Sequence, residues 1–257
     1  MKKKPLIFIT NDDSVGAPGI RALISVMREF GRVVVVAPDK PQSGTGHAIT
    51  MNTPLRLKKI ADTPGFEEYS CNGTPVDCVK LGFKVVLRGR PDILVSGVNH
   101  GSNASINIIY SGTMAGVLEG CMSGVPSIGF SLDDYSHDAD MEPSKKYIRA
   151  IVADVLENSL PDGVCLNVNI PGLPADSIRG IKVCRQAGGT WQEDFDERVD
   201  PVGRNYYWLK GIFIRKGNGA DTDVSALEKG YVAIVPVQYD FTAVKAISDL
   251  KKRNIHA

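Results

Sequence analysis

The chain has 257 residues, of which 43% are hydrophobic and 23% are charged, and its formal net charge is +1. This length and composition are typical of a globular enzyme with a substantial apolar core. The balance of 30 basic and 29 acidic residues argues against a nucleic-acid polymer or a membrane surface as partner. No apolar run is long enough to cross a bilayer, and the five cysteines fit a reduced, cytoplasmic protein.

The first two thirds of the chain alternate between apolar runs and helical patterns. Helix signals are clear at Thr74, Pro75 and Asp77, which predict an N-cap, a first helical residue and a capping box. Continuous apolar strands separated by helices predict an α/β fold with a parallel sheet covered on both faces. We expect strands at 6–10, 32–38, 91–99, 125–132 and 164–171, and helices at 18–31, 74–83, 111–124 and 143–158.

The pattern changes after about residue 172. Short alternating stretches occur at 181–186, 205–215 and 231–239, with polar segments between them. This alternation predicts antiparallel hairpins added to the α/β core. The segment 242–253 is expected to form a short terminal helix.

Polar side chains follow the first three strands of the predicted sheet. Asp12 and Asp13 follow the first strand, Ser43 lies in the glycine-rich loop after the second, and Asn99 ends the third. The carboxyl ends of parallel strands meet at one edge of a sheet, so we expect these side chains to share a cleft. Their oxygen donors suit Mg²⁺, Mn²⁺ or Ca²⁺. A divalent cation would also neutralise two adjacent carboxylates that otherwise repel each other.

A second feature is the sequence Ser111-Gly112-Thr113 before an apolar helix. A helix N-terminus offers free N–H groups and the positive end of a dipole, and both favour phosphate. A cation site and a phosphate cradle in one cleft indicate hydrolysis of a phosphate ester.

Each of these features also has a purely structural interpretation. Two aspartates after a strand commonly form a turn, and Ser-Gly-Thr before a helix commonly forms an N-cap. We interpret Glu119, inside an apolar helix, as a paired structural charge, and His47 and His100 as loop residues or substrate contacts. The functional interpretation therefore depends on the conjunction of the sites.

Seven segments of the chain resemble the SurE survival-protein family of metal-dependent nucleotidases. They cover nearly the whole chain in the order of the family. The resemblance implies a Rossmann-like, mostly parallel three-layer sandwich with a C-terminal β-hairpin extension, as a single domain over 1–257 with a β-rich arm at about 185–235. The segments are TNDDSVGAPGI (10–20), VVAPDKPQSGTGHAIT (35–50), NGTPVDCV (72–79), PDILVSGVNHGSNA (91–104), YSGTMAGVLEG (110–120), LNVNIP (166–171) and TDVSALEKGYVAIVPV (222–237).

The resemblance also implies an activity and a set of site residues. The implied activity is that of a 5′/3′-nucleotidase, which removes phosphate from nucleoside monophosphates and also acts on short polyphosphate. One Mn²⁺ or Mg²⁺ per subunit is implied, in a homodimer or homotetramer that exchanges the hairpin. The implied metal ligands are Asp12, Asp13, Ser43 and Asn99; the catalytic residues are Asp12, Asp13, Asn103 and Ser111; and the substrate- and phosphate-binding residues are Asn103, Ser111, Gly112, Thr113, Ser43 and Gly44.

The chain departs from the family pattern at three places near the predicted site. The family usually reads N-D-D-G, whereas this chain has Ser14 at the glycine position. A serine there is strained if the backbone needs a positive φ. The ligand loop commonly reads S-G-A-S-x-S-L-T, whereas here it reads SGTGHAIT, which brings His47 toward the cleft. The loop after Asn103 reads ASINIIY and lacks a glycine that the family often has there.

Three questions stay open from the sequence. The nucleophile is either a water activated by the metal or an aspartate, Asp12 or Asp13. A phosphatase of the haloacid dehalogenase type is an alternative, but its D-x-D pattern is absent after the first strand. A non-catalytic nucleotide or metal sensor is the other alternative.

Overall fold

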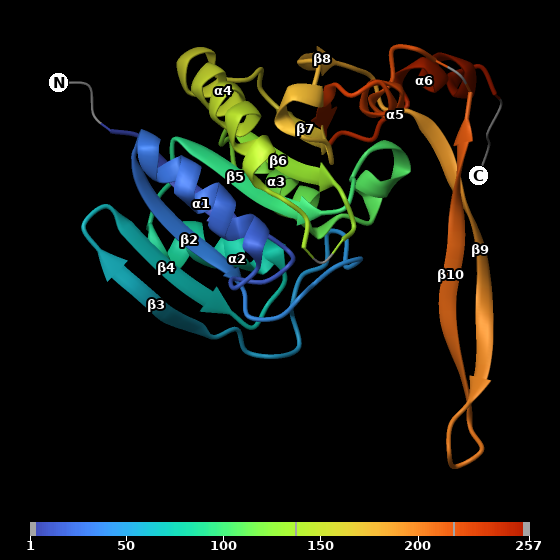
Figure 1. Cartoon of the computed structure of the whole chain (residues 1–257), viewed down its shortest axis with the longest axis horizontal. Helices are drawn as coiled ribbons and strands as arrows, with labels where there is room; N and C mark the ends of the chain where they lie inside the picture. The colour runs from blue at the N-terminus through green and yellow to red at the C-terminus, as the bar shows by residue number, and fades with distance from the viewer. Residues whose placement is uncertain (1–3, 137, 218, 254–257) are drawn as a thin grey trace.

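The computed structural model describes residues 4–136, 138–217 and 219–253. Its body is a nine-stranded sheet flanked by helices (Figure 1). Six neighbouring strands are parallel: β4 (Phe66–Cys71), β2 (Arg32–Pro38), β1 (Leu6–Thr10), β5 (Ile93–His100), β6 (Ser127–Asp133) and β7 (Val164–Pro171). The other three are β3 (Leu57–Thr63), antiparallel to β4; β11 (Val232–Gln238), antiparallel to β7; and β8 (Ile181–Val183), parallel to β11. The expected α/β fold with a mostly parallel sheet is therefore confirmed.

Helices cover both faces of the sheet and make three layers. The helices that pack against the sheet are α1 (Pro18–Phe30) and α4 (Glu142–Asn158) on one face, with α2 (Pro75–Leu81) and α3 (Gly112–Met122) on the other. The remaining helical segments are η1 (Gly82–Val86), η2 (Ser105–Ile109), η3 (Ala175–Ser177), α5 (Asp223–Glu228) and α6 (Val244–Lys251). Among the residues that the structure describes, no helix combines the length and the apolar character needed to cross a membrane.

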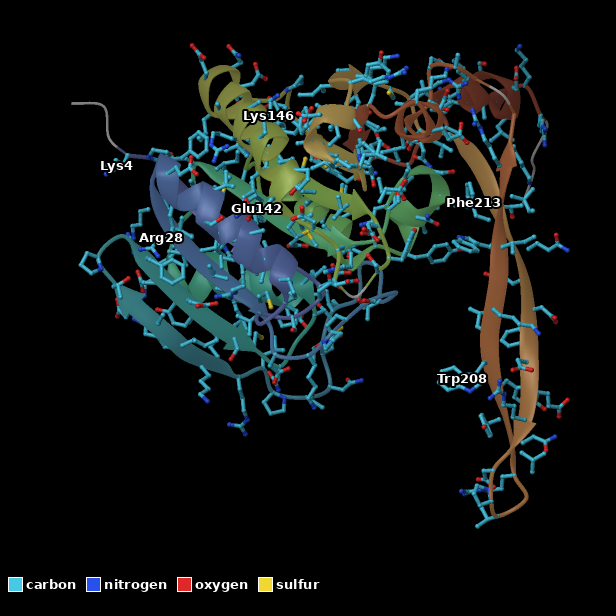
Figure 2. The ribbon with its side chains drawn as sticks, viewed as in Figure 1. Lys4, Arg28, Glu142, Lys146, Trp208 and Phe213 are labelled. Atoms are coloured by element: carbon cyan, nitrogen blue, oxygen red, sulfur yellow. The ribbon has the colours of Figure 1, made fainter. Side chains whose placement is uncertain are left out.

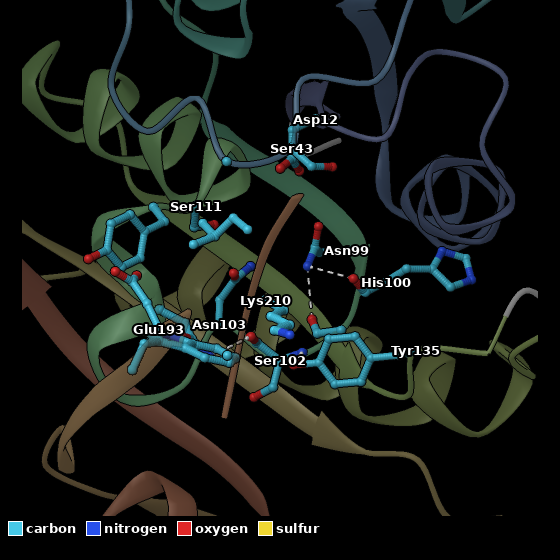
Figure 3. Close-up of a pocket in the computed structure, with 17 residues that line it drawn as sticks. Asp12, Ser43, Asn99, His100, Ser102, Asn103, Ser111, Tyr135, Glu193 and Lys210 are labelled. Atoms are coloured by element: carbon cyan, nitrogen blue, oxygen red, sulfur yellow. Dashed lines mark hydrogen bonds between the residues drawn. The ribbon is translucent and has the colours of Figure 1, made fainter. Parts of the chain in front are cut away.

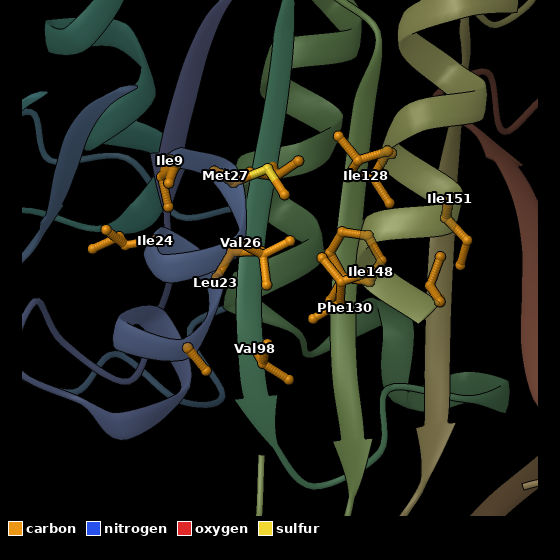
Figure 4. Close-up of a cluster of buried hydrophobic side chains, with 14 of the residues drawn as sticks. Ile9, Leu23, Ile24, Val26, Met27, Val98, Ile128, Phe130, Ile148 and Ile151 are labelled. Carbon is orange, nitrogen blue, oxygen red and sulfur yellow. The ribbon is translucent and has the colours of Figure 1, made fainter. Parts of the chain in front are cut away.

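The apolar spacing seen in the sequence explains how the helices attach to the sheet. Leu23 and Met27 of α1 lie one turn apart and are fully buried in the same cluster as Ile148 of α4 and Phe130 of β6 (Figure 4). On the opposite face, α2 begins at the predicted cap, where the backbone N–H of Asp77 donates to the Thr74 hydroxyl (3.2 Å). The two clusters thus attach α1 and α2 to opposite faces of the sheet.

The C-terminal part contains one long hairpin. In the part of the chain that the structure describes, β9 (Gly188–Val199) and β10 (Asn205–Lys216) pair only with each other. They project from the body, and we call this hairpin the arm (Figure 1). Figure 2 shows Phe213 on the arm close to the body and Trp208 farther along it. The predicted terminal helix is present as α6.

Two expectations for this region were wrong. The stretches at 181–186 and 231–239 do not form added hairpins, because β8 and β11 extend the central sheet beside β7. Val232 and Ala233 of β11 are fully buried there, which gives this strand its place in the core. The arm also begins inside a segment that we expected to be a polar connection, since β9 covers Gly188–Val199.

Candidate active site

Asp12 lies at the carboxyl edge of the sheet, just beyond β1, with its side chain against the N-terminus of α3. The Thr113 hydroxyl donates a hydrogen bond to Oδ1 of Asp12. Gly112 makes this approach possible, because a Cβ at that position would lie 2.7 Å from the Cβ of Asp12. The first turn of α3 therefore directs its positive end at a buried carboxylate.

Burial raises the pKa of both adjacent carboxyl groups. The pKa of Asp12 is raised to about 6 by burial, against the hydrogen bond from Thr113 that lowers it, and the negative charge of Asp13 raises it further. Burial also raises the pKa of Asp13, opposed by the backbone N–H of His100, which donates to its Oδ2 (3.1 Å). A cation bound between these groups would remove the cost of ionising them.

The Asn99 side chain is oriented by the backbone that follows it. Its amide nitrogen donates to the carbonyl oxygens of His100 (3.1 Å) and Gly101 (2.8 Å). The carboxamide oxygen therefore points the other way, toward Asp12 and Ser43 (Figure 3). Three oxygen-bearing side chains from three different strand ends thus converge, as the parallel topology predicts.

These residues line a pocket of about 540 Å³. The pocket brings together six of the predicted site residues: Asp12, Ser43, Gly44, Asn99, Asn103 and Ser111. Asp13 lies beside it, held by the backbone of His100. Gly112 and Thr113 stand behind Asp12 and contact that carboxylate.

The donor set of this pocket fits a hard divalent cation. Within the described ranges, no group of three or more His, Cys, Asp or Glu side chains is arranged to hold a metal. The predicted ligands are instead two carboxylates, one hydroxyl and one carboxamide, all of them oxygen donors. Mg²⁺ and Mn²⁺ accept such a set, with further positions left for water and substrate oxygen.

A network of buried amides holds Asn103. Its backbone N–H donates to Oδ1 of Asn169 (2.8 Å), its carbonyl accepts from Nδ2 of Asn167 (2.9 Å), and its own Nδ2 donates to the Ser131 hydroxyl (2.9 Å). The roles of Asn167, Asn169 and Ser131 were not predicted. A signal was present in LNVNIP, where two asparagines with a spacing of two share one face of an otherwise apolar strand.

Ser111 is the N-cap of α3, as the sequence indicates. Its Oγ accepts the backbone N–H of Met114 (3.1 Å) while the side chain lines the pocket. Accepting this bond leaves the hydroxyl proton available for a ligand oxygen. The same residue is therefore both a cap and a candidate phosphate contact.

The structure distinguishes the two histidines near the site. His47 does not join the donor set, because its Nε2 lies 3.2 Å from Oε2 of Glu119. The other oxygen of Glu119, Oε1, accepts from Nζ of Lys80 (2.5 Å). The interpretation of Glu119 as a paired structural charge is thus confirmed. His100 lines the pocket, and its Nδ1 lies 4.0 Å from Oδ2 of Asp13.

The outer part of the pocket is formed by residues that the sequence did not indicate. Tyr110 and Tyr135 contribute aromatic rings from the body. The arm contributes Trp191, Glu193, Leu209, Lys210 and Gly211. No local motif marks these residues, because their place in the site depends on how the arm docks.

Comparison with known proteins agrees with this fold. A sequence model of the family described as "Survival protein SurE" matches residues 7–193, more than half of the chain. The protein named 5′-nucleotidase SurE of Christiangramia forsetii is 56% identical over 257 residues, covering 99% of each chain. The protein of the same name from Flavobacterium psychrophilum is 55% identical over 254 residues, covering 98% of this chain and 99% of that one. The crystal structure of the SurE protein from Aquifex aeolicus superposes with a TM-score of 0.83 at 39% identity, covering 96% of this chain and 98% of that one. The chain therefore belongs to the SurE family.

Proposed function

We propose that this protein is a divalent-metal-dependent phosphomonoesterase that hydrolyses nucleoside 5′- and 3′-monophosphates, with short polyphosphate as a further substrate. The observation that carries the proposal is the convergence of Asp12, Ser43 and Asn99 with Asn103 and Ser111 in one pocket. The names of the relatives, 5′-nucleotidase SurE, support the same reaction.

The proposed cation is one Mn²⁺ or Mg²⁺ per subunit, held by Asp12, Asp13, Ser43 and Asn99. When bound, it would polarise the phosphoryl group and activate water. The chain itself prepares the site by presenting the Asp12 carboxylate and the Asn99 oxygen to the same pocket, with the Asp13 carboxylate beside it. Thr113 and the backbone of His100 fix the two carboxylates from behind.

The phosphate is proposed to bind to Asn103 and Ser111. The Asn103 Nδ2 donates one of its two N–H groups to Ser131, which leaves the second N–H and the Ser111 hydroxyl to donate to the phosphate. The Asn103 oxygen remains to accept a hydrogen bond from the attacking water. The positive end of α3 stabilises the negative charge that develops on the phosphoryl oxygens. Gly112 and Thr113 contribute to this field from behind Asp12.

Water is the proposed nucleophile, with attack by an aspartate as the alternative. One oxygen of Asp12 accepts from Thr113, and one oxygen of Asp13 accepts from His100. Carboxylates held in this way, and shared with a cation, are poorly placed to move toward phosphorus. The choice is testable, because only attack by an aspartate leaves a phosphorylated protein to be trapped by acid quench.

The proposal includes the setting of the enzyme. We infer one domain over 1–257, a cytoplasmic location, and a homodimer or homotetramer in which the arm takes part. The arm exposes apolar side chains on both of its faces, and a second copy would cover some of them: Tyr207, Trp208 and Ile212. Sedimentation of the full chain and of Trp208→Ser tests this inference, and equal sedimentation as a monomer for both proteins contradicts it.

Phosphate release from a substrate panel tests the proposed reaction. The panel contains 5′- and 3′-nucleoside monophosphates and tripolyphosphate, each with Mn²⁺, with Mg²⁺ and with EDTA. We expect release from the monophosphates with either cation and none in EDTA. Release that EDTA leaves unchanged contradicts the metal dependence, and metal-dependent nucleotide binding without release favours a sensor.

A further inference from the structure

One face of the arm forms the outer wall of the pocket. The register pairs Trp191 with Phe213 and Glu193 with Gly211. Side chains alternate along a strand, so Trp191 and Glu193 project from the same face of the arm. Trp191, Glu193 and Gly211 all line the pocket, so this face looks toward the phosphate-binding residues.

The root of the arm is fixed to the loop that carries the site. Asp223, which is fully buried, accepts the backbone N–H groups of Ser105 (2.8 Å) and Ala187 (2.8 Å). The Ser105 hydroxyl also donates to the carbonyl oxygen of Ala187 (2.9 Å). Ser105 follows Asn103 by two residues, and Ala187 immediately precedes β9. The position of the arm is therefore linked to the position of the phosphate site.

Trp191 is held in place while its ring remains accessible. The indole N–H donates to Oδ1 of Asn107 (2.9 Å), and the ring packs edge-on against Phe213 at 5.8 Å between centroids. The side chain nevertheless remains partly exposed, at 37% for the residue, and it lines the pocket. A fixed aromatic ring with its polar group already satisfied is suited to stack on another planar ring.

Glu193 supplies an acceptor on the same wall. Among the described residues, its carboxylate takes part in no hydrogen bond or ion pair. The opposing position on β10 is a glycine, which has no side chain to pair with the carboxylate. A carboxylate near a planar ring is the combination that accepts hydrogen bonds from ribose hydroxyls in nucleotide sites. The volume of the pocket, about 540 Å³, lies within the range of small-molecule sites.

We propose that Trp191 and Glu193 of the arm form a nucleoside subsite, in which the base stacks on Trp191 and the sugar hydroxyls donate to Glu193. This inference rests on the proposed function, because it places the phosphate of the same substrate on Asn103 and Ser111. Stacking accepts any base, so the subsite selects nucleosides over simpler phosphate esters with little preference among bases.

The first test compares two substrates that differ only in the base. Turnover of AMP and of ribose 5-phosphate is measured for the wild-type protein, Trp191→Leu, Trp191→Phe and Phe195→Leu. Phe195 projects from the same face of β9 but lies outside the pocket lining, so it is the matched control. We expect Trp191→Leu to raise KM for AMP about tenfold and to leave ribose 5-phosphate within about twofold. Phe195→Leu is expected to stay near wild type for both substrates. Trp191→Phe keeps an aromatic ring for stacking, so it is expected to recover most of the AMP affinity that Trp191→Leu loses.

The same series contains a test of the carboxylate. Glu193→Gln is expected to lower kcat/KM for AMP about threefold to tenfold and to have a smaller effect on 2′-deoxy-AMP. An equal loss for AMP and ribose 5-phosphate in Trp191→Leu indicates a purely structural role for Trp191 and overturns the subsite.

The second test does not need turnover. The chain has two tryptophans, so in Trp208→Phe the only remaining indole is Trp191. We expect adenosine to quench its fluorescence with saturation and ribose to leave it unchanged. Absence of quenching by adenosine in a protein that hydrolyses AMP rejects the subsite and keeps the proposed function. Quenching in a protein that releases no phosphate supports the subsite while the proposed function fails.

Discussion

The hydroxyl of Thr113 donates a hydrogen bond to Oδ1 of Asp12 and so joins the first turn of α3 to the end of β1. This bond stabilises the ionised carboxylate and lowers its pKa, whereas burial raises the pKa to about 6. Thr113→Val removes the bond with little change of shape. We expect the acid limb of the pH profile of Mn²⁺ affinity to move upward by roughly half to one pH unit. Thr113→Ser retains the hydroxyl and is the control, and an unshifted profile in Thr113→Val contradicts this role.

Asp12 is expected to destabilise the metal-free fold at neutral pH. Its folded pKa of about 6 lies above the ordinary value of 3.8, so the folded state binds the proton more tightly than the unfolded state. The stability from this group is complete below pH 3.8 and is lost as the pH rises through 6. Asp12→Asn should therefore raise the free energy of unfolding in EDTA at pH 7.5 by about 2–3 kcal/mol.

Chemical denaturation at two pH values checks the direction of this change in the free energy of unfolding. The gain from Asp12→Asn should be present at pH 7.5 and nearly absent at pH 4, and Mn²⁺ should stabilise only the wild-type protein at pH 7.5. Asp162→Asn changes an exposed aspartate in the turn before β7 and serves as control. If the metal-free Asp12→Asn protein is less stable than wild type at pH 7.5, the predicted destabilisation by Asp12 is contradicted.

Ser14 has a φ of +94°, in the region that favours glycine. Its carbonyl accepts from the backbone N–H of Ala17 (3.1 Å) and from Nδ2 of Asn11 (2.8 Å), and both bonds survive removal of the side chain. Ser14→Gly should relieve the backbone strain and stabilise the fold by about 1 kcal/mol, which corresponds to a rise in Tm of about 2–4 °C. The matched control is Ser25→Gly on the exposed side of α1, which should lower Tm. A lower Tm for Ser14→Gly goes against the strain argument.

Asn169 positions the loop that presents Asn103. Its Oδ1 accepts the backbone N–H of Asn103 (2.8 Å), and Asn169 is fully buried. Asn169→Ala leaves that N–H without its partner, so we expect a loss of about 1–3 kcal/mol in stability. Displacement of Asn103 should lower kcat about 10- to 100-fold while Mn²⁺ affinity stays within about twofold. Asn158→Ala, at the exposed end of α4, is the control. Equal losses in kcat and in Mn²⁺ affinity point instead to a general disturbance of the site.

The parts of the fold that could be predicted are those with strong local signals. The bounds of β1, β2 and β7 match the apolar runs, because strands buried on both faces are mostly apolar. The edge hairpin of β3 and β4 was not predicted, since charged residues such as Lys58 and Lys59 make it look like a loop. Lysines of this kind protect an edge from pairing with other strands. The residue pattern of β9 did not indicate a strand, because most of its side chains are polar and none is fully buried. Only the family resemblance implied a β-rich arm over this region.

The candidate site likewise contains residues that the sequence predicts and residues that only tertiary contacts bring into place. Asp12, Ser43 and Asn99 could be brought together from sequence, because topology alone places the ends of parallel strands at one edge. The supporting residues Asn167 and Asn169 act through contacts with a loop more than 60 residues away in sequence. The arm wall depends on Asp223, a buried carboxylate whose partners Ser105 and Ala187 share no motif with it. Tertiary contacts of this kind carry no local signature.

The most direct test of the central claim is a Mn²⁺ titration of phosphate release from AMP. Protein treated with EDTA and then freed of it is assayed as Mn²⁺ is added, beside Asp12→Asn and the control Asp162→Asn. We predict that release begins from zero, rises to a plateau at about one Mn²⁺ per chain, and follows the same course in Asp162→Asn. Asp12→Asn should show almost no release at any Mn²⁺ concentration. Full activity before Mn²⁺ is added, or an Asp12→Asn protein as active as wild type, would contradict the proposed site and the reaction assigned to it.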